Sequence, residues 1–170
     1  MRNQKGFSLI ELLIVVAIIL IIAAIAIPNL MRARIAANES AGASTVRTLN
    51  TAENTYSTTY AGQGFAPNLT TLGPNGVDCT VPANVTATSA CLIDGILGTA
   101  PFTKGAFVYN ISSTVATAPV PDYLITATSV TKTAATRDYC SNTDAVVRSQ
   151  VTTGSGIASP TACNALPAIQ

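Results

Sequence analysis

The chain has 170 residues, 48% of them hydrophobic and only 10% charged, and its formal net charge is +1. The charged fraction is well below the roughly 25% of an average globular domain. A nucleic-acid-binding domain gathers Lys and Arg in a basic patch. This chain has no such patch, so a nucleic-acid partner is not indicated. Histidine, the commonest general base and metal ligand, is absent. Because no GxSxG, P-loop or metal-ligand spacing occurs either, we expect no enzymatic activity, no catalytic residue, no metal site and no cofactor.

The first thirty residues contain a long apolar segment, Phe7–Ile27, in which Glu11 is the one charged residue. At a rise of about 1.5 Å per residue, a helix of this length spans roughly 31 Å, the thickness of the hydrocarbon core of a bilayer. Arg2 and Lys5 precede the segment and should stay in the cytoplasm. We therefore expect the rest of the chain to face the periplasm or the exterior.

Three interpretations of this segment differ in how they account for Glu11. A secretory signal peptide has a shorter apolar run of about 7–15 residues, although Ala24–Ala26 resembles its cleavage site. A permanent single-pass anchor explains the length, but a charged residue in a span is costly and usually has a partner. A helix that leaves the lipid and packs among copies of itself provides that partner. If the chain is cut between Gly6 and Phe7, the new ammonium group can pair with Glu11 of a neighbour.

In the third interpretation, the charge pair sets how neighbouring helices are staggered. Two opposite charges about 4 Å apart attract by about 4 kcal/mol at an effective dielectric constant of about 20. Removing one partner of a buried pair typically costs about 3–5 kcal/mol. One helix would therefore slide along the next until the carboxylate meets the amine, a register that apolar contacts alone would not specify.

A recognisable motif surrounds the apolar segment. It consists of KGFSLIE at residues 5–11, then the apolar run, then IPNL at residues 27–30. This pattern resembles the class III signal of type IV pilins and type II secretion pseudopilins, and the resemblance covers about Lys5 to Tyr60. Beyond Tyr60 the resemblance to the family is weaker.

The resemblance implies how the chain is processed and assembled. A membrane prepilin peptidase would cut after Gly6 and methylate the amine of Phe7, and Glu11 would match the assembly glutamate of the family. Loss of Arg2 and Lys5 with the leader peptide would change the formal net charge from +1 to −1.

Leu20 departs from the family pattern. Relatives often have a glycine there, and their helix tends to unwind between that glycine and the proline in assembled filaments. In this chain Pro28 is the remaining breaker. Because proline lacks an N–H and its ring clashes with the preceding turn, we expect a helix kink at Pro28. Whether residues 20–27 unwind in a filament stays open.

A second helical pattern follows Pro28 and predicts one helix from about residue 7 to 61, roughly 80 Å long. Its apolar stripe, at spacings of three, four or seven, comprises Ile35, Gly42, Val46, Leu49, Ala52, Tyr56 and Tyr60. The charged residues that mostly lie off this stripe are Arg32, Arg34, Glu39, Arg47 and Glu53. Gly62 and Gly64 favour a helix end. We expect Tyr56 and Tyr60 to anchor the helix on the following domain.

The remainder of the chain alternates between loop and strand signals. Residues 62–105 are rich in Pro and Gly and predict a loop-rich stretch. Strand signals follow at 105–112, 122–129 and 145–151. The segment 136–150 resembles the later strands of the pilin family. We expect side chains to alternate between the two faces of the sheet. The inward-facing residues are Phe107, Tyr109, Ile111, Tyr123, Ile125 and Ala127. Leu124, Thr126 and Thr128 lie on the other face of their strand.

Four cysteines, Cys79, Cys91, Cys140 and Cys163, lie far apart behind the apolar segment. Their even number and expected location favour disulfides, and free buried thiols are the alternative. Four cysteines allow three connectivities. We prefer Cys79–Cys91 and Cys140–Cys163, because both close short local loops and neither crosses the expected sheet.

The aspartates do not form a metal-binding cluster. They are dispersed along the second half of the chain, at Asp78, Asp94, Asp122, Asp138 and Asp144. Some pseudopilins bind calcium in a loop, but no EF-hand-like spacing occurs here. We expect Asp138 and Asp144, which lie near a turn, to be solvated.

The resemblance implies an α+β pilin fold, in which a long N-terminal α-helix packs on a small antiparallel β-sheet head of three or four strands. The expected parts are a cleaved leader peptide at 1–6, a transmembrane and filament-core helix at 7–28, an amphipathic continuation at 29–61 and a globular head at 62–170. Within the head we expect a loop region at about 62–105, a sheet at about 106–152 and a disulfide-pinned C-terminal tail.

These features favour a structural subunit of a type IV pilus, held in the inner membrane before assembly and extracellular afterwards. Its expected partners are copies of itself, prepilin peptidase, the assembly platform in the inner membrane and lipid. A type II secretion pseudopilin and a minor tip or adhesin subunit are the alternatives. The sequence does not choose among twitching, adhesion, DNA uptake and electron transfer.

Overall fold

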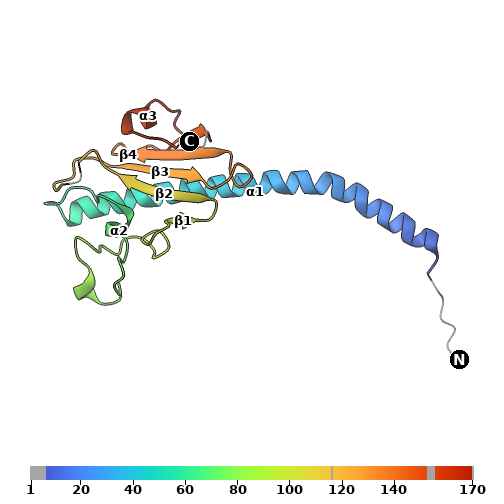
Figure 1. Cartoon of the computed structure of the whole chain (residues 1–170), viewed down its shortest axis with the longest axis horizontal. Helices are drawn as coiled ribbons and strands as arrows, with labels where there is room; N and C mark the ends of the chain where they lie inside the picture. Colours follow the sequence, from blue (N-terminus) through green and yellow to red (C-terminus); the bar gives the residue numbers. More distant parts are fainter. Residues whose placement is uncertain (1–6, 116, 153–155, 170) are drawn as a thin grey trace. The chain divides into compact units, whose positions relative to one another are not determined.

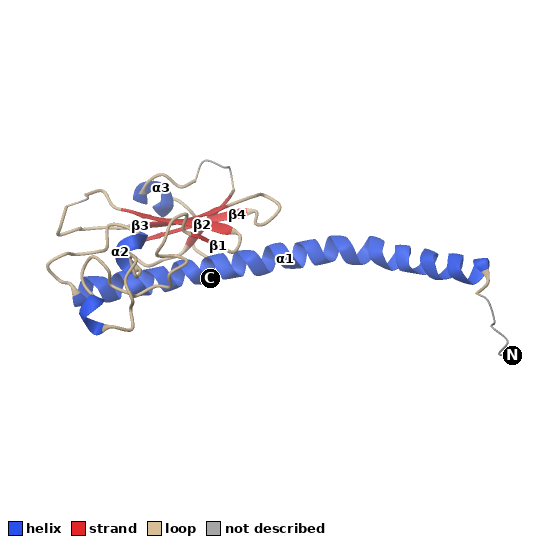
Figure 2. Cartoon of the chain, turned by 60° about the horizontal axis from the view of Figure 1, so that its bottom comes forward, coloured by secondary structure: helices blue, strands red, loops and turns tan. Residues whose placement is uncertain are grey.

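A computed structural model describes residues 7–115, 117–152 and 156–169 (Figures 1 and 2). Its elements are α1 (Leu9–Thr59), α2 (Leu69–Leu72), η1 (Pro82–Asn84), β1 (Thr103–Lys104), β2 (Phe107–Ser112), β3 (Leu124–Ser129), β4 (Arg137–Asn142), β5 (Arg148–Val151) and α3 (Pro160–Asn164). The expected α+β architecture, a long N-terminal helix with a small antiparallel sheet, is confirmed. The chain divides into two compact units, residues 1–34 and 35–170, each of which is described by itself.

The described part of the first unit is the apolar half of α1, and its side chains are exposed apart from the half-buried Ala23. The helix continues through Pro28, so the missing N–H does not end it in the single chain. Residues 20–27 are helical throughout. A kink at Pro28 and unwinding of residues 20–27 in a filament both stay predictions.

The second unit is built on one antiparallel sheet with the strand order β1-β2-β3-β4-β5. The sheet therefore has five strands, at least one more than the expected three or four. The extra strand is β1, in which Thr103 pairs with Val108 and Lys104 with Phe107. Two residues are too few to show alternation, so this edge strand left no signal in the sequence.

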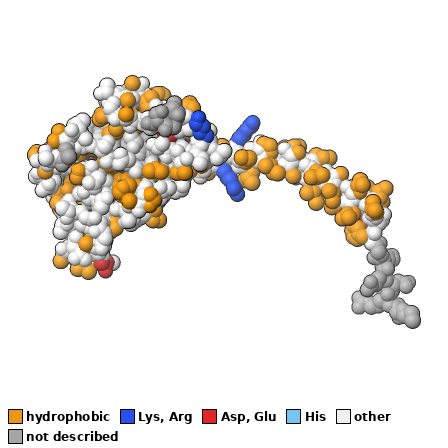
Figure 3. Space-filling view, viewed as in Figure 1, with side chains coloured by type: hydrophobic (Ala, Val, Ile, Leu, Met, Phe, Trp, Pro, Cys, Tyr) orange, Lys and Arg blue, Asp and Glu red, His pale blue; other side chains and the backbone are white. Residues whose placement is uncertain are grey.

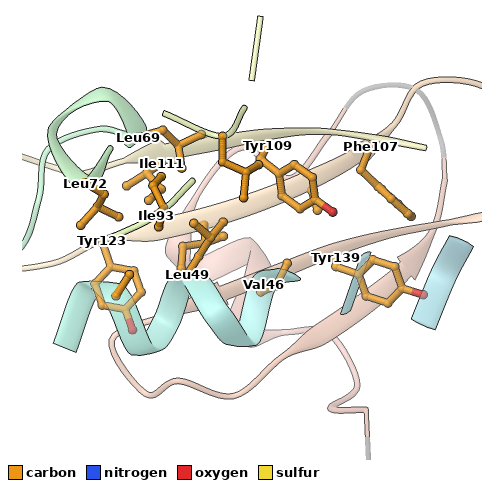
Figure 4. Packing of buried hydrophobic residues seen from close by; sticks show 14 of the residues in the cluster. Val46, Leu49, Leu69, Leu72, Ile93, Phe107, Tyr109, Ile111, Tyr123 and Tyr139 are labelled. Atoms are coloured by element: carbon orange, nitrogen blue, oxygen red, sulfur yellow. The ribbon is translucent and has the colours of Figure 1, made fainter. Parts of the chain in front are cut away.

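The later part of α1, from residue 35 on, packs its apolar stripe against one face of the sheet (Figure 4). Val46 and Leu49 are fully buried in this core. Across the sheet, Tyr109 lies opposite Ala127, and Ala127 lies opposite Tyr139. The small side chain of Ala127 leaves room for the two rings on either side, so the alternation read from β2 and β3 places the aromatic residues in the core.

Gly42 allows the helix to approach the sheet closely. A Cβ atom at this position would lie 2.5 Å from the ring of Phe107, a distance that side chains do not tolerate. The Phe107 ring packs in turn on Tyr139, with ring centroids 5.6 Å apart. Glycine at position 42 therefore sets the distance between α1 and the first core ring of β2.

The opposite face of the sheet carries a second, smaller core. Leu124 of β3 and Cys140 of β4 are buried there against Ile157 and Cys163. Leu124 does lie on the other face from Ile125, as expected, but residues of the C-terminal tail cover it. The sheet is thus sandwiched between α1 and the segment around α3.

Candidate assembly site

One segment of α1 is long and apolar enough to cross a membrane, judged by length and composition, and none of it is buried. Phe7 is 82% exposed, and the large apolar residues that follow it as far as Met31 are exposed as well. Soluble monomeric proteins rarely expose an apolar surface of this extent, and such surfaces mark membrane or protein contacts. This surface therefore requires lipid or other helices to cover it.

Glu11 has a partner within its own chain. Its Oε2 atom accepts a hydrogen bond of 2.9 Å from the backbone N–H of Ser8, which directly precedes the first helical residue, Leu9. A glutamate at the third helical position often caps a helix in this way, and Ser-x-x-Glu is its sequence signature. Residues 8–11, Ser-Leu-Ile-Glu, carry this signature, which the sequence analysis did not interpret as a cap. In the single chain the Glu11 carboxylate satisfies a free backbone donor.

The two predicted processing residues lie at the edge of the described chain. Gly6 falls outside the described residues, and Phe7 lies before the helix begins. Their roles in cleavage and methylation stay predictions. Phe7 lies next to the Ser8–Glu11 cap. A cut after Gly6 would therefore place the new ammonium group of Phe7 near the start of the helix.

Two polar side chains near the start of the second unit hold a turn of the head against α1. Asn38 Nδ2 donates to the carbonyl of Ala134 at 2.7 Å. Glu39 Oε1 accepts from both the backbone N–H and the hydroxyl of Thr136, at 2.9 and 2.6 Å. These contacts join residues nearly one hundred positions apart, so they fix the turn between β3 and β4 to the helix.

Glu53 contradicts the expectation that it lies off the apolar stripe. Its side chain is fully buried, and its Oε2 atom accepts from the backbone N–H of Ala66 at 2.9 Å. Its Oε1 atom has no hydrogen-bond partner among the described residues. Burial raises the pKa of Glu53 to about 8, and the hydrogen bond from Ala66 opposes that shift. The group is therefore largely protonated at neutral pH, which lowers the cost of burying it.

Tyr56 anchors the helix on the head, as expected. It is buried, and its hydroxyl donates to the carbonyl of Ala87 at 2.7 Å. Tyr60 is half-buried, and its ring centroid lies 5.0 Å from that of Tyr56. Both tyrosines serve to dock the end of α1.

The two aspartates expected in solvent differ from one another. Asp144 is exposed and pairs with Arg148 at 2.6 Å, and the hydrogen bond from Arg148 holds its pKa below the ordinary value. Asp138 is buried, so its expected solvation is wrong. Asp138 Oδ1 accepts from the Ser129 backbone N–H and the Thr152 hydroxyl, at 2.9 and 2.6 Å. Its side chain is buried because its position on β4 places it beside these two donors. No group of three or more potential metal-ligating residues occurs within the described residues.

The cysteines form two disulfides, Cys79–Cys91 and Cys140–Cys163. These are the pairs preferred from their spacing. The first braces the loop-rich part of the head. The second is fully buried in the small core beneath Leu124 and ties the tail to β4.

Comparison with known proteins gives the family. The family model described as "Prokaryotic N-terminal methylation motif" matches residues 1–27. The "Type IV wide pilus major component PilA4" of Thermus thermophilus is 41% identical over 105 residues, covering 58% of this chain and 78% of that protein. The chain belongs to the type IV pilin family. The "Type IV major pilin protein PilA" of Myxococcus xanthus is 44% identical over 54 residues, covering 32% of this chain and 24% of that protein.

Membership of the pilin family accounts for the exposed apolar segment. The matched motif includes Gly6, Phe7 and Glu11, although it does not test their individual roles. Pilins are structural proteins, which points away from an enzyme. No solved structure matches the chain.

Proposed function

We propose that this pilin is a structural subunit of a type IV pilus. It would wait in the inner membrane as a single-pass precursor and then polymerise through α1 into a filament on the cell surface. The observation that carries the proposal is the uncovered apolar surface of residues 7–27, interrupted by the carboxylate of Glu11. Lipid and a bundle of identical helices can each cover such a surface, the first before assembly and the second afterwards.

The proposed division of the chain follows from this pathway. Residues 1–6 are a leader removed by prepilin peptidase, which cuts after Gly6 and methylates Phe7. Residues 7–28 are the membrane and filament-core helix, 29–61 its amphipathic continuation and 62–170 the head. An assembly platform in the inner membrane would extract the processed subunit from lipid.

Glu11 changes partner in this mechanism. In the single chain its carboxylate accepts from the Ser8 backbone N–H. In the filament it would accept from the methylated ammonium group of Phe7 on a neighbouring subunit. Pairing with an ammonium group adds the attraction of two opposite charges, which the neutral Ser8 N–H does not provide. It also replaces water and lipid headgroups that no longer reach either charge. The exchange makes assembly depend on the carboxylate.

The names of the relatives favour a pilus over the alternatives. Both are named as major components of type IV pili, whereas a pseudopilin or tip subunit would be a scarce component. Electron microscopy of sheared surface fibres, with mass spectrometry of their main protein band, tests the proposal. We expect fibres whose main band is this chain. Fibres of another composition, or no fibres from producing cells, would contradict it.

A further inference from the structure

A groove of about 360 Å³ lies on the second unit between α1 and β4. Its lining includes Ala36, Ala43 and Arg47 from α1, Arg137 and Tyr139 from β4, and Ile169. Small apolar side chains and a tyrosine ring make its walls, and two guanidinium groups border it. Arginine and tyrosine are enriched where proteins bind one another, so the groove has the composition of a docking surface.

The groove carries an excess of positive charge. Neither Arg47 nor Arg137 takes part in the two side-chain ion pairs found within the described residues. Arg137 Nη1 donates to the neutral hydroxyl of Ser149 at 3.1 Å. The acid of the groove, Glu39, directs Oε1 to Thr136. Two arginines against one carboxylate leave the groove able to receive an anionic side chain.

A protruding segment of the head has the complementary chemistry. Residues 75–83, which we call the knob, are all exposed. The knob carries one acid, Asp78, between Val77 and Val81, which are 37% and 43% exposed. In Figure 3 the lobe formed by this part of the chain, green in Figure 1, presents acidic and hydrophobic atoms at its tip. The knob therefore offers one negative charge with apolar groups on both sides.

The knob is held in shape by local bonds. The disulfide Cys79–Cys91 ties it to the loop that follows. Asp78 Oδ1 accepts from the backbone N–H and the hydroxyl of Thr80, at 2.9 and 2.8 Å, and the backbone bond holds the pKa of Asp78 below its ordinary value. The other carboxylate oxygen, Oδ2, makes no protein hydrogen bond within the described residues. A preorganised, ionised knob loses little conformational freedom when it docks.

Groove and knob share no residue. The groove is lined by helix residues from Ala36 to Arg47, whereas the disulfide-closed loop contacts the helix at Tyr56, whose hydroxyl bonds to Ala87. Ala43 and Tyr56 are about 20 Å apart along the helix at 1.5 Å per residue. The knob and the groove of one chain are therefore separate surfaces. Contacts between two different surfaces of identical subunits generate rings or filaments.

We propose that the knob of one subunit docks in the groove of another, with Asp78 facing Arg47 and Arg137. This inference rests on the proposed function, since it names the contact between heads in the filament. The other acids of the second unit are less suited to the role. Asp94 and Asp144 pair with Lys104 and Arg148, and Glu53 and Asp138 are buried. Asp122 uses both carboxylate oxygens to hold Thr114.

Site-specific photo-crosslinking in assembled filaments tests the contact. A benzophenone amino acid replaces Val81, which leaves Asp78 in place, and sheared filaments are irradiated and digested. We expect a crosslinked dimer whose joined peptides contain residue 81 and either residues 36–47 or residues 137–139. The same probe at Val115, an exposed valine between β2 and β3 that belongs to neither the groove nor the knob, serves as a control that should not crosslink to residues 36–47.

The outcomes separate this inference from the proposed function. If filaments form and the crosslink joins residue 81 to another surface, or only within one chain, the docking proposal is wrong and the pilus proposal stands. If the unmodified chain forms no filaments, the pilus proposal fails first.

Charge exchange provides a second test in the full chain. Asp78→Arg and Arg137→Glu should each lower the yield of sheared filaments, and the double variant should restore part of it, because Arg47 still faces position 78. Lys132→Glu removes an exposed cation of the same region outside the groove and should leave the yield unchanged. Single variants that assemble normally, or a double variant that stays defective while its chain accumulates in the membrane, would contradict the pairing.

Discussion

The Oε2 atom of Glu53 accepts a hydrogen bond of 2.9 Å from the backbone N–H of Ala66, thirteen residues further along the chain, and the carboxyl group is fully buried. This bond fastens the first residues of the head to the last turns of α1. Next to it, the backbone of Gly64, with φ +74°, bridges to Val120. The junction between helix and head thus depends on a protonated acid in the core.

Stability should fall as pH rises, because Glu53 has a pKa of about 8 in the folded chain against an ordinary value of 4.5. Between these values the native state binds more protons than the unfolded state, so the free energy of unfolding decreases with pH. The slope is at most about 1.4 kcal/mol per pH unit. Thermal unfolding of the oxidised full chain in detergent from pH 5 to 8 measures it. Glu53→Gln, which keeps the shape but cannot ionise, should lose this slope, and an equal slope in both proteins would contradict the assignment.

Gly42→Ala should destabilise the second unit by about 1–3 kcal/mol, the usual cost of overpacking a core. The new Cβ would meet the Phe107 ring at 2.5 Å, so the helix or the ring must move. Urea unfolding of the full chain in detergent gives the difference in free energy. Gly62→Ala is the matched control, because no atom lies within 4 Å of a Cβ there. Equal stabilities of the two variants would show that Gly42 does not set the helix–sheet distance.

Replacing Cys140 and Cys163 by serine should destabilise the head more than replacing Cys79 and Cys91. Chain entropy alone gives about 3 kcal/mol for either cross-link, since the sequence separations are 23 and 12 residues. The 140–163 pair is also buried against Leu124, so its loss leaves two hydroxyl groups in an apolar site. Melting temperatures of the two double variants give the order, and the reverse order would contradict the account of the second core.

Asp138→Ala should destabilise the chain by about 1–3 kcal/mol, because it leaves the Ser129 N–H and the Thr152 hydroxyl without their acceptor. Asp144→Ala removes an ion pair near the surface, in which the Asp144 side chain is 39% exposed and the Arg148 side chain 14%, and it should cost less than Asp138→Ala. Denaturation of the two variants under the same conditions compares them. If Asp144→Ala lowers the free energy of unfolding more than Asp138→Ala does, the proposed stabilising role of the buried Asp138 is wrong.

Helical and strand periodicity predicted most of the fold. The stripe from Gly42 to Tyr56 and the alternation in β2 and β3 follow from apolar spacing, and the structure buries those residues. Glu53 shows where such reasoning fails. It lies four residues after Leu49 and three before Tyr56, so its spacing put it on the stripe, and its charge alone argued for solvent. The hydrogen bond from Ala66 and the protonation of the carboxyl group together make its burial possible.

The second core, around Leu124, could not be predicted from periodicity either. Leu124 is one apolar residue on a threonine-rich strand face, and the tail that covers it has no marked periodicity. The disulfide was the usable signal, because Cys140 lies on the same face of the sheet as Leu124. At the helix start, the Ser8–Glu11 cap has a known local signature, Ser-x-x-Glu, so this contact of Glu11 is predictable from the sequence.

The most direct test of assembly through Glu11 compares three variants of that residue in producing cells. Glu11→Gln keeps an oxygen that can accept from the Ser8 N–H but loses the charge, Glu11→Val loses both, and Glu11→Asp keeps the charge. Membrane fractions report insertion, and sheared fibres counted by electron microscopy report assembly. We predict that all three chains insert and that Glu11→Gln and Glu11→Val form few or no filaments, while Glu11→Asp retains part of the yield. Normal filaments from Glu11→Gln would show that the helix cap suffices and would contradict charge pairing between subunits.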